Sequence, residues 1–194
     1  MSFEQISLAV LVKKIGEDTT ETVLSDFICN TNLEVQDYLH NKAIKHEKRG
    51  ISKTVLITDT KTGAIVGYYS ITTKSFILSE KINSNAKKRL FGTSQTNGNI
   101  IPAILIGQLG KNENVISDFT GKDLMSFIFR YIKKMSELTP SVIVYVEHDG
   151  RESLIKYYEQ AGFKPFKREK EETEQGLYCH IIKTKDILDL LNCD

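Results

Sequence analysis

The pattern of apolar and polar positions predicts a domain of mixed helices and strands. Apolar residues at helical spacing predict helices over residues 19–27, 33–49, 121–137 and 151–161, a weakly helical basic stretch over 80–92, and a short helix over 186–191. Runs of β-branched, aromatic and other apolar residues predict strands over 6–12, 54–58, 65–72, 100–109, 142–146 and 177–182, with another beginning at Phe163. This order is typical of an α/β (α+β) fold in which helices flank a mixed, mostly antiparallel central sheet.

Turn and cap residues divide these elements. Asn32 is expected to cap the helix that follows it, and Gly50 to end that helix. The segment Asp59–Gly63 is expected to turn, so that the strands on either side form an antiparallel hairpin. Two further connections are predicted from composition, a loop over 92–99 and a charged turn over 167–175.

Length and composition favour one domain. The chain has 194 residues, of which 40% are apolar and 26% charged, enough to build a hydrophobic core under a polar surface. No repeat or linker divides it, so residues 1–194 are predicted to form a single domain, with 184–194 as a short helical extension. The net charge of +1 gives a nucleic-acid-binding function no support from bulk charge.

Cysteine usage and hydropathy indicate a cytoplasmic protein without a metal site. The three cysteines are scattered and lack C-x-x-C spacing, which argues against a disulfide framework or a zinc site and for a reducing compartment. The longest apolar run, 100–106, is too short to span a bilayer and contains Pro102. The N-terminus lacks the basic and apolar regions of a signal peptide.

The segment from Ser153 to Phe163 carries the most specific chemistry. Its apolar residues lie at helical spacing, and Gly162 suits the left-handed end of a helix. Tyr157 and Tyr158 point about 100° apart on such a helix, so one can pack while the other reaches a cleft. A phenol held in this way can donate a proton to a leaving group. The plainer interpretation is a core helix with two half-buried tyrosines.

This segment resembles the final helix of the GNAT (Gcn5-related) N-acetyltransferases, whose pattern is F-Y-x-x-x-G-F. The predicted order of strands and helices from Ile100 onward is also that of the second half of the GNAT fold. The resemblance implies direct transfer of an acetyl group from acetyl-CoA to a primary amine. It also implies that Tyr158, the second aromatic residue of the pattern, protonates the departing thiolate.

Three further segments resemble the toxin-type branch of this family, in which the toxin of a toxin–antitoxin pair acetylates aminoacyl-tRNA. Together with the Tyr158 helix they span most of the chain. The segments are Phe27–Asn30 followed by Leu33, Tyr38–Leu39 and Ala43 (F-x-C-G…L-D-x-Y/F-L…A), Val66–Ile71 (V-G-Y-Y-x-L) and Ile101–Lys111 (I-P-x-x-L-L-G-R-L-A-V). The resemblance implies aminoacyl-tRNA as the acceptor, an antitoxin protein as a partner, and a homodimer.

The family binds the pyrophosphate of acetyl-CoA at a Q/R-x-x-G-x-G/A turn that opens a helix. The resemblance implies cofactor contacts at Leu109, Lys111, Thr120, Gly121, Lys122 and Leu124. The turn departs from the pattern, because Asp123 and Met125 replace small residues, and Gln108 replaces a basic residue on the preceding strand. Thr120 and Asp123 have the spacing of a capping box, so the helix can satisfy its own amides and repel phosphate. The alternative is a GNAT-shaped binding module that no longer uses acetyl-CoA.

Two groups of basic residues are candidates for binding an RNA backbone. In the toxin branch the second group is implied to hold the tRNA, and its predicted contacts here are Lys87, Lys88 and Arg89. Acidic residues interrupt both groups, so the alternatives are a solvated helix face and an acetyltransferase for small molecules or proteins. Glu147 and His148 follow a strand, where they can act as a base or bind substrate, or simply form a solvated loop end. The groups are Lys42, Lys45, Lys48, Arg49 and Lys53, then Lys74, Lys81, Lys87, Lys88 and Arg89.

Overall fold

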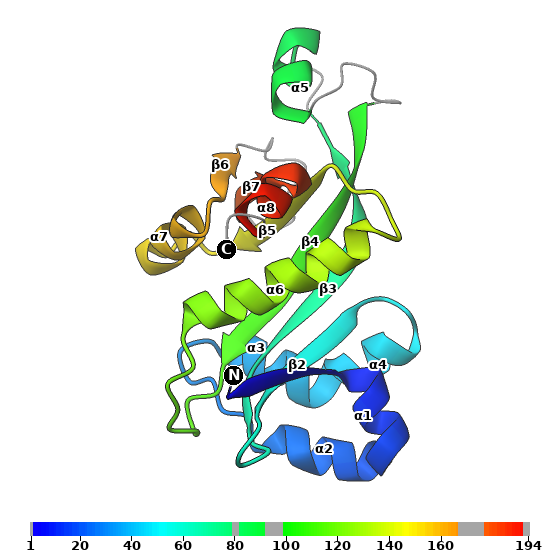
Figure 1. Ribbon diagram of the computed structural model, residues 1–194, viewed down its shortest axis with the longest axis vertical. Coiled ribbons are helices and arrows are strands. Elements are labelled where there is room, and N and C mark those ends of the chain that lie inside the picture. Colours follow the sequence, from blue (N-terminus) through cyan, green and yellow to red (C-terminus); the bar gives the residue numbers. More distant parts are fainter. Residues whose placement is uncertain (1, 79–81, 92–98, 167–176, 192–194) are drawn as a thin grey trace. The chain divides into compact units, whose positions relative to one another are not determined.

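The computed structural model describes residues 2–78, 82–91, 99–166 and 177–191, which form helices and a seven-stranded sheet (Figure 1). The strand order is β1-β2-β3-β4-β5-β7-β6. The pairs β1–β2, β2–β3, β5–β7 and β6–β7 are antiparallel. The mixed, mostly antiparallel α/β fold predicted from the sequence is therefore confirmed. The chain forms two compact units, Met1–Thr72 with Ile106–Ile128 and Thr73–Leu105 with Phe129–Asp194.

The first unit holds the N-terminal helices and the predicted hairpin. Its strands are β1 (Phe3–Ser7), β2 (Lys53–Asp59), the first part of β3 (Ile65–Ile77) and the last part of β4 (Ile100–Lys111). Its helices are α1 (Leu8–Ile15), α2 (Glu17–Ser25), α3 (Leu33–Asp37), α4 (Ala43–Lys48) and the start of α6 (Gly121–Ser136). The Gly63 amide donates to the Asp59 carbonyl at 2.8 Å, which closes the turn of the predicted hairpin.

The strand predicted over residues 6–12 is wrong for most of its length. β1 ends inside this range, and α1 begins at Leu8. Leu8 is buried, and Leu11 and Val12 pack against the same core, whereas Val10 is 45% exposed. Packed positions three and four residues apart belong to a helix, and a continuous apolar run does not by itself distinguish a helix from a strand.

The long helix predicted after Asn32 contains a π-helical turn over Tyr38–Lys42. Asn32 caps the helix as predicted, because its Oδ1 accepts an amide N–H of the first turn at 3.2 Å. The π-turn lets the sequence neighbours Tyr38 and Leu39 both face the core. Gly50 follows the end of α4 at a φ of +66°, a conformation that favours glycine, as predicted.

Tyr68 of β3 lies at the centre of the first unit's core. Its ring packs edge-on against Phe27 with 5.1 Å between centroids and parallel to Tyr38 at 6.4 Å. Its hydroxyl donates to the Val35 carbonyl at 2.5 Å. Next to this core, Asn112 holds the loop before α3 in place, because its Oδ1 accepts a hydrogen bond from the Ile28 amide at 3.0 Å. The segment Phe27–Asn30 at the start of that loop is thus held by the hydrogen bond to Asn112 and by the aromatic contact of Phe27.

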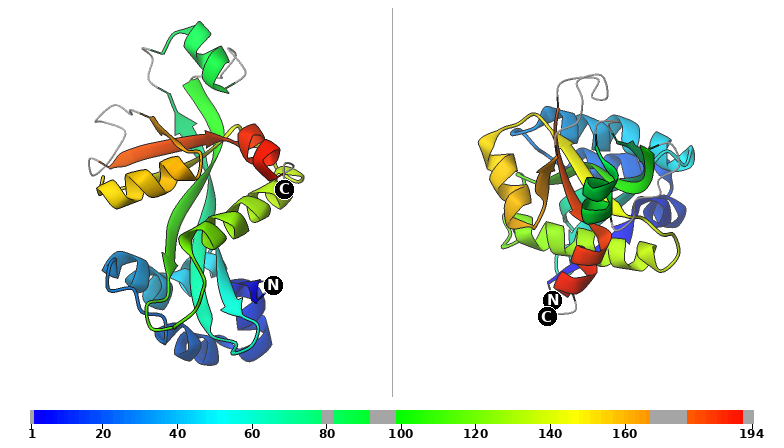
Figure 2. Two further views of the ribbon diagram at one scale, coloured as in Figure 1. Left: turned by 60° about the vertical axis from the view of Figure 1, so that its left-hand side comes forward. Right: turned by 90° about the horizontal axis from the view of Figure 1, so that it is seen from above.

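The second unit holds the other ends of β3 and β4 and the C-terminal elements. These are α5 (Ser84–Phe91), the end of α6, β5 (Ile143–His148), α7 (Glu152–Gln160), β6 (Lys164–Phe166), β7 (Tyr178–Lys183) and α8 (Thr184–Leu191). α7 lies alongside the β6–β7 pair, and α8 follows β7 directly (Figure 2). The loop predicted over 92–99, apart from Asn99, and the charged turn predicted over 167–175 lie outside the described residues.

The core of the second unit is aromatic. Phe76 is fully buried and packs edge-on against Tyr145 at 5.0 Å and against Phe166 at 5.4 Å. These rings lie on one face of the β5–β7–β6 strands, so the residues that alternate with them on β5 and β7 face α7. In the parts of the chain that the structure describes, no helix combines the length and the apolar character needed to cross a membrane.

Candidate functional site

Tyr158 is a buried residue of α7, with 4% of its surface exposed. Its ring lies 5.3 Å from His148, 5.2 Å from Tyr157 and, edge-on, 5.8 Å from Phe163. The helix closes as the sequence predicts. Gly162 has a φ of +92°, and the Phe163 amide donates to the Tyr158 carbonyl at 3.0 Å, the bond that ends a helix on a left-handed glycine. The chain reversal therefore fixes the turn of α7 that carries Tyr158.

Burial controls the chemistry of this phenol. Desolvation raises the pKa of Tyr158 well above its ordinary value, and it raises the pKa of Tyr157 as well. Both phenols therefore stay protonated at neutral pH. A protonated phenol is the state from which a proton can be donated.

Two histidines from neighbouring strands complete the surroundings of Tyr158. His148 ends β5 and His180 lies on β7, and they are 6% and 2% exposed. His148 Nε2 lies 3.0 Å from His180 Nδ1, and the Gly150 amide donates to His148 Nδ1 at 3.1 Å. The solvated loop end that was the plainer interpretation of His148 is therefore wrong. A role for His148 as a general base is also unsupported, because both of its ring nitrogens are engaged.

The start of α6, in the first unit, is closed by its own capping box. The Asp123 carboxylate accepts the Thr120 amide at 2.7 Å and also the Thr120 hydroxyl, and the Asp123 amide donates back to Thr120 Oγ1 at 3.2 Å. The predicted reciprocal cap is confirmed. The cap places a carboxylate at the helix end where the family binds phosphate, and Lys122, which is exposed, is the cation beside it.

The other predicted cofactor contacts are also in the first unit. Leu109 and Lys111 lie near the C-terminal end of β4, where Leu109 is half-buried and Lys111 is exposed. Gly121 is the first residue of α6. Leu124 is 2% exposed, so its side chain belongs to the core and does not face a ligand. Its amide donates to the Thr120 carbonyl at 3.1 Å within the helix.

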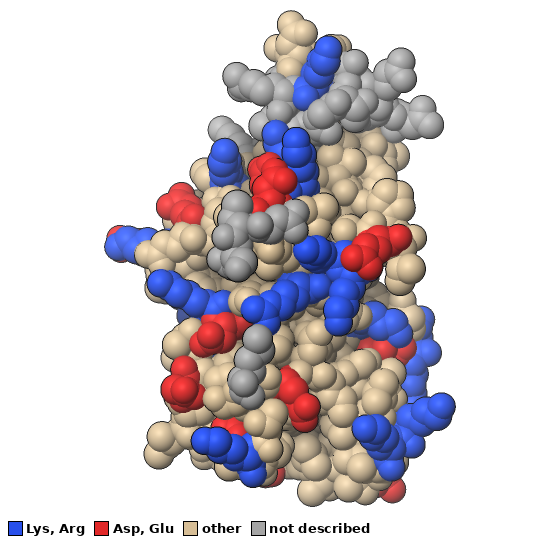
Figure 3. Space-filling model, viewed as in Figure 1, with Lys and Arg blue, Asp and Glu red and all other residues tan. Residues whose placement is uncertain are grey.

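The predicted RNA contacts lie on α5 in the second unit. Lys88 is exposed, while Lys87 donates a hydrogen bond to the side chain of Asn99. Arg89 lies in this helix, but its side chain is outside the described residues, as is the whole of Lys81. Figure 3 shows that basic and acidic side chains are interspersed over the face it presents.

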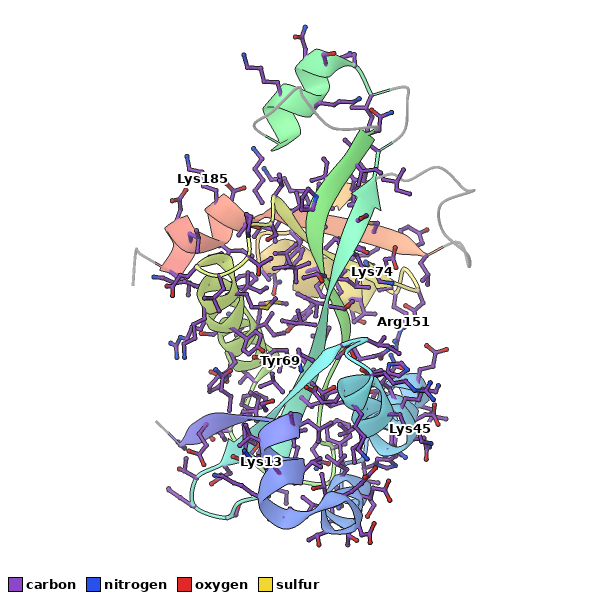
Figure 4. The ribbon with its side chains drawn as sticks, turned by 90° about the vertical axis from the view of Figure 1, so that its right-hand side faces the viewer. Lys13, Lys45, Tyr69, Lys74, Arg151 and Lys185 are labelled. Carbon is purple, nitrogen blue, oxygen red and sulfur yellow. The ribbon has the colours of Figure 1, made fainter. Side chains whose placement is uncertain are left out.

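Acidic partners neutralise much of the other basic group, in the first unit. Lys42 pairs with Asp37 at 2.6 Å, Lys53 pairs with the buried Glu47 at 2.7 Å, and Lys48 pairs with Glu17. Lys45 is exposed at the surface, where Figure 4 labels it. The ion pairs favour the interpretation of this group as a solvated helix face.

Known structures resemble the whole chain. A structure described as a bacterial toxin has a TM-score of 0.74 and 17% identity, covering 99% of this chain and 96% of its own. AtaT complexed with acetyl-methionyl-tRNAfMet has a TM-score of 0.71 and 17% identity, covering 97% and 99%. A mutant of KacT has a TM-score of 0.70 and 16% identity, covering 98% and 99%. The chain has the GNAT fold. No protein-family model matches it, and no curated protein matches its sequence.

Sequence reasoning missed two residues of the Tyr158 surroundings. His180 contacts His148, and the ring of Tyr178 stacks on His148 with 6.0 Å between centroids. Their spacing along β7, at alternate positions, indicated that they share a face. The sequence did not reveal the register that sets His148 opposite Tyr178, because the paired residues of β5 and β7 are separated by 30 (148 to 178) to 40 (143 to 183) positions in sequence.

Proposed function

We propose that the chain is an N-acetyltransferase that moves the acetyl group of acetyl-CoA to the amine of an aminoacyl-tRNA. The observation that carries the proposal is Tyr158, a protonated phenol buried on α7 of a GNAT fold. The acceptor is suggested by AtaT, a structural neighbour whose described complex contains acetyl-methionyl-tRNAfMet. The closest chemical alternative is acetylation of a small-molecule or protein amine.

Acetyl-CoA would supply an acetyl group activated as a thioester. As the acceptor amine forms its bond to the acetyl carbon, the bond to sulfur breaks and Tyr158 donates its proton to that sulfur. The attacking nitrogen releases one proton, and Tyr158 regains one from solvent, so that the proton balance closes. Because burial keeps the pKa of Tyr158 high, the phenol enters each cycle protonated.

The residues proposed to hold acetyl-CoA are Leu109, Lys111, Thr120, Gly121, Lys122 and the backbone at Leu124. They fit it only in part. Lys122 supplies a positive charge at a helix N-terminus, which suits pyrophosphate. Asp123 opposes it, because its negatively charged carboxylate accepts the Thr120 amide at this helix end. This self-capped helix is what favours the second candidate function, a GNAT-shaped binding or regulatory module.

We further propose that residues 1–194 work as one catalytic domain with 184–194 as an extension, in the cytoplasm, where acetyl-CoA and tRNA are both present. Lys87, Lys88 and Arg89 are the proposed tRNA contacts. An antitoxin protein is a proposed partner, since a mutant of AtaT, a structural neighbour, is described as bound to the C-terminus of the antitoxin AtaR. A homodimer is the proposed assembly.

The deciding experiment begins with calorimetric titration of acetyl-CoA, followed by transfer assays with radiolabelled acetyl-CoA. Aminoacyl-tRNA, uncharged tRNA, a lysine peptide and a polyamine are offered separately. We expect label on the aminoacyl-tRNA alone. Label on the peptide or polyamine would instead identify the alternative acceptor, and no binding at millimolar acetyl-CoA would favour the binding module.

Charge reversal separates the acceptors further. Replacing Lys87, Lys88 and Arg89 by glutamate is expected to abolish transfer to tRNA while acetyl-CoA binding is kept. The matched control reverses three exposed lysines of the first unit that lie outside both basic groups, Lys13, Lys14 and Lys61, which changes the net charge equally. Equal losses in both variants would show that only net charge matters.

A further inference from the structure

The hydrogen bonds of the two buried histidines fix where their protons lie. The Gly150 amide donates to His148 Nδ1 at 3.1 Å, so that nitrogen is an acceptor and carries no proton. Neutral His148 therefore carries its proton on Nε2, and this N–H donates to His180 Nδ1 at 3.0 Å. His180 then carries its own proton on Nε2. A continuous series of hydrogen bonds therefore runs from the Gly150 amide through His148 to His180.

The last N–H group in this series of hydrogen bonds has no acceptor among the described residues. His180 Nε2 is buried and has no hydrogen-bond partner among the described residues. A buried donor left without a partner destabilises the fold, and such groups are rare in native proteins. Packing alone gives no reason for a histidine here, because an apolar residue of similar size would avoid the cost.

The histidine pair contacts Tyr158 itself and the turn before its helix. The His148 ring packs on Tyr158 at 5.3 Å, and the His180 ring lies 6.4 Å from it. The Gly150 amide that His148 accepts belongs to the turn directly before α7, the helix that carries Tyr158. A movement of either histidine would therefore reach the phenol through its ring contact and through the start of its helix.

We propose that His148 and His180 form a positioning pair that holds the Tyr158 phenol in place for proton donation. The proposal rests on the proposed function, because it takes Tyr158 as the proton donor of acetyl transfer. The pair acts only while both rings are neutral. A proton added to His180 Nδ1 would face the His148 N–H, and one added to His148 Nδ1 would face the Gly150 N–H.

Burial favours that neutral state. Desolvation lowers the pKa of both histidines below the ordinary value, and the proximity of His180 lowers that of His148 further. Asp149 and Glu159 act in the opposite direction, on His148 and His180 respectively. Within the part of the chain that the structure describes, the titratable and charged groups that act on or contact the pair are Asp149 and Arg151 before α7, Tyr158 and Glu159 on α7, and Tyr178 on β7. Tyr157 packs on Tyr158 behind them.

Nitrogen NMR of the whole protein with labelled histidine tests the geometry without any assay. At neutral pH we expect both His148 and His180 to be neutral with the proton on Nε2, assigned by comparing His148→Asn and His180→Asn spectra. A charged ring, or a proton on Nδ1 of either residue, would overturn the proposal whether or not the protein is an acetyltransferase.

Kinetics of two His180 variants tests the role. His180→Asn keeps an acceptor at the place of Nδ1, whereas His180→Leu removes it at similar volume. If the pair positions Tyr158, His180→Leu lowers kcat on the order of tenfold to a hundredfold with an unchanged KM for acetyl-CoA, and His180→Asn restores most of the rate.

The acid limb of the kcat profile gives a second reading of the same variants. In the wild type the acid limb should follow protonation of the histidine pair. In His180→Asn it should move, because the asparagine at position 180 cannot titrate. Equal kcat losses in both variants, or an unmoved acid limb, would refute the positioning role. If the wild type is active and Tyr158→Phe lowers kcat but His180→Leu does not, the positioning role of the pair is refuted and the proposed function stands. If the wild type is inactive and binds no acetyl-CoA, the proposed function itself is refuted.

Discussion

The start of α6 and the surroundings of Tyr158 are built on opposite principles. At the helix start, Thr120 and Asp123 form hydrogen bonds with each other within four residues of sequence, Thr120 being exposed and Asp123 half-buried. Around Tyr158, residues from α7, β5 and β7 are buried together, and one donor, His180 Nε2, is left unsatisfied. Sites that break a packing rule are the ones where function is expected, whereas a helix that satisfies itself has less to offer a ligand.

The largest expected effect is the loss of turnover in Tyr158→Phe. The substitution keeps the buried ring and removes only the proton, so the rate should fall by about 10² to 10⁴ while acetyl-CoA affinity and folding are kept. Tyr157→Phe is the matched control, since it removes the neighbouring phenol of the same helix. Steady-state acetyl transfer measures both, and a rate equal to that of the wild type in Tyr158→Phe would remove the proposed proton donor.

The close packing around Tyr158 also predicts a loss of stability when Gly150 is replaced. It has a φ of +82°, and a Cβ there would lie 2.2 Å from the Tyr178 ring. Gly150→Ala is therefore expected to cost about 1–2 kcal/mol for the left-handed backbone and more for the displaced ring. Gly63→Ala, at a φ of +74° with open space around it, should cost only the backbone part. Denaturant unfolding compares the two, and equal losses would mean that Tyr178 moves freely.

The buried histidines also predict a pH dependence of stability. Their pKa values are lowered in the folded state, so the unfolded chain binds protons first as the pH falls. Stability is then full above the ordinary value of 6.5 and is lost as the pH drops toward the folded values. Unfolding measured from about pH 7.5 to about pH 5.5 should show this slope.

The control for this slope is a protein without the two rings. In the double variant His148→Asn/His180→Asn the slope should be smaller over the same interval, even if the absolute stability differs. The exposed carboxyls of Asp37, Glu113 and Asp149, whose pKa values are also lowered, titrate at more acid pH and do not contribute there. An unchanged slope in the double variant would assign the pH dependence to other groups.

Local rules were enough wherever the structure is local. The hairpin at Asp59–Gly63, the Asn32 cap, the Thr120–Asp123 box and the Gly162 helix end were all predicted, because each depends on a few neighbouring residues. The strand predicted at 6–12 failed because an apolar run carries no period of its own.

Long-range pairing was out of reach of the sequence. The contact between His148 and His180 depends on the register that sets Val146 opposite His180, which follows from how β5, β6 and β7 assemble. The π-turn that brings both Tyr38 and Leu39 to the core likewise depends on tertiary packing. The proton donor was found by resemblance and the residues around it only by structure.

The smallest expected effect is a change in acetyl-CoA affinity when Asp123, at the start of α6, is replaced. This change tests whether the chain binds acetyl-CoA as an enzyme would or is a binding module that does not use it. Asp123→Asn keeps an acceptor for the Thr120 amide but removes the negative charge. One charge at a helix N-terminus is worth about 0.3–1 kcal/mol, so acetyl-CoA affinity should rise about two- to fivefold. Asp123→Ala also removes the acceptor of the Thr120 amide, at a cost of about 1 kcal/mol of stability. If calorimetry finds tighter binding in Asp123→Asn, the pyrophosphate meets this helix. If the wild type binds and the variant binds equally, the anchor lies elsewhere, and Lys122 loses its proposed role.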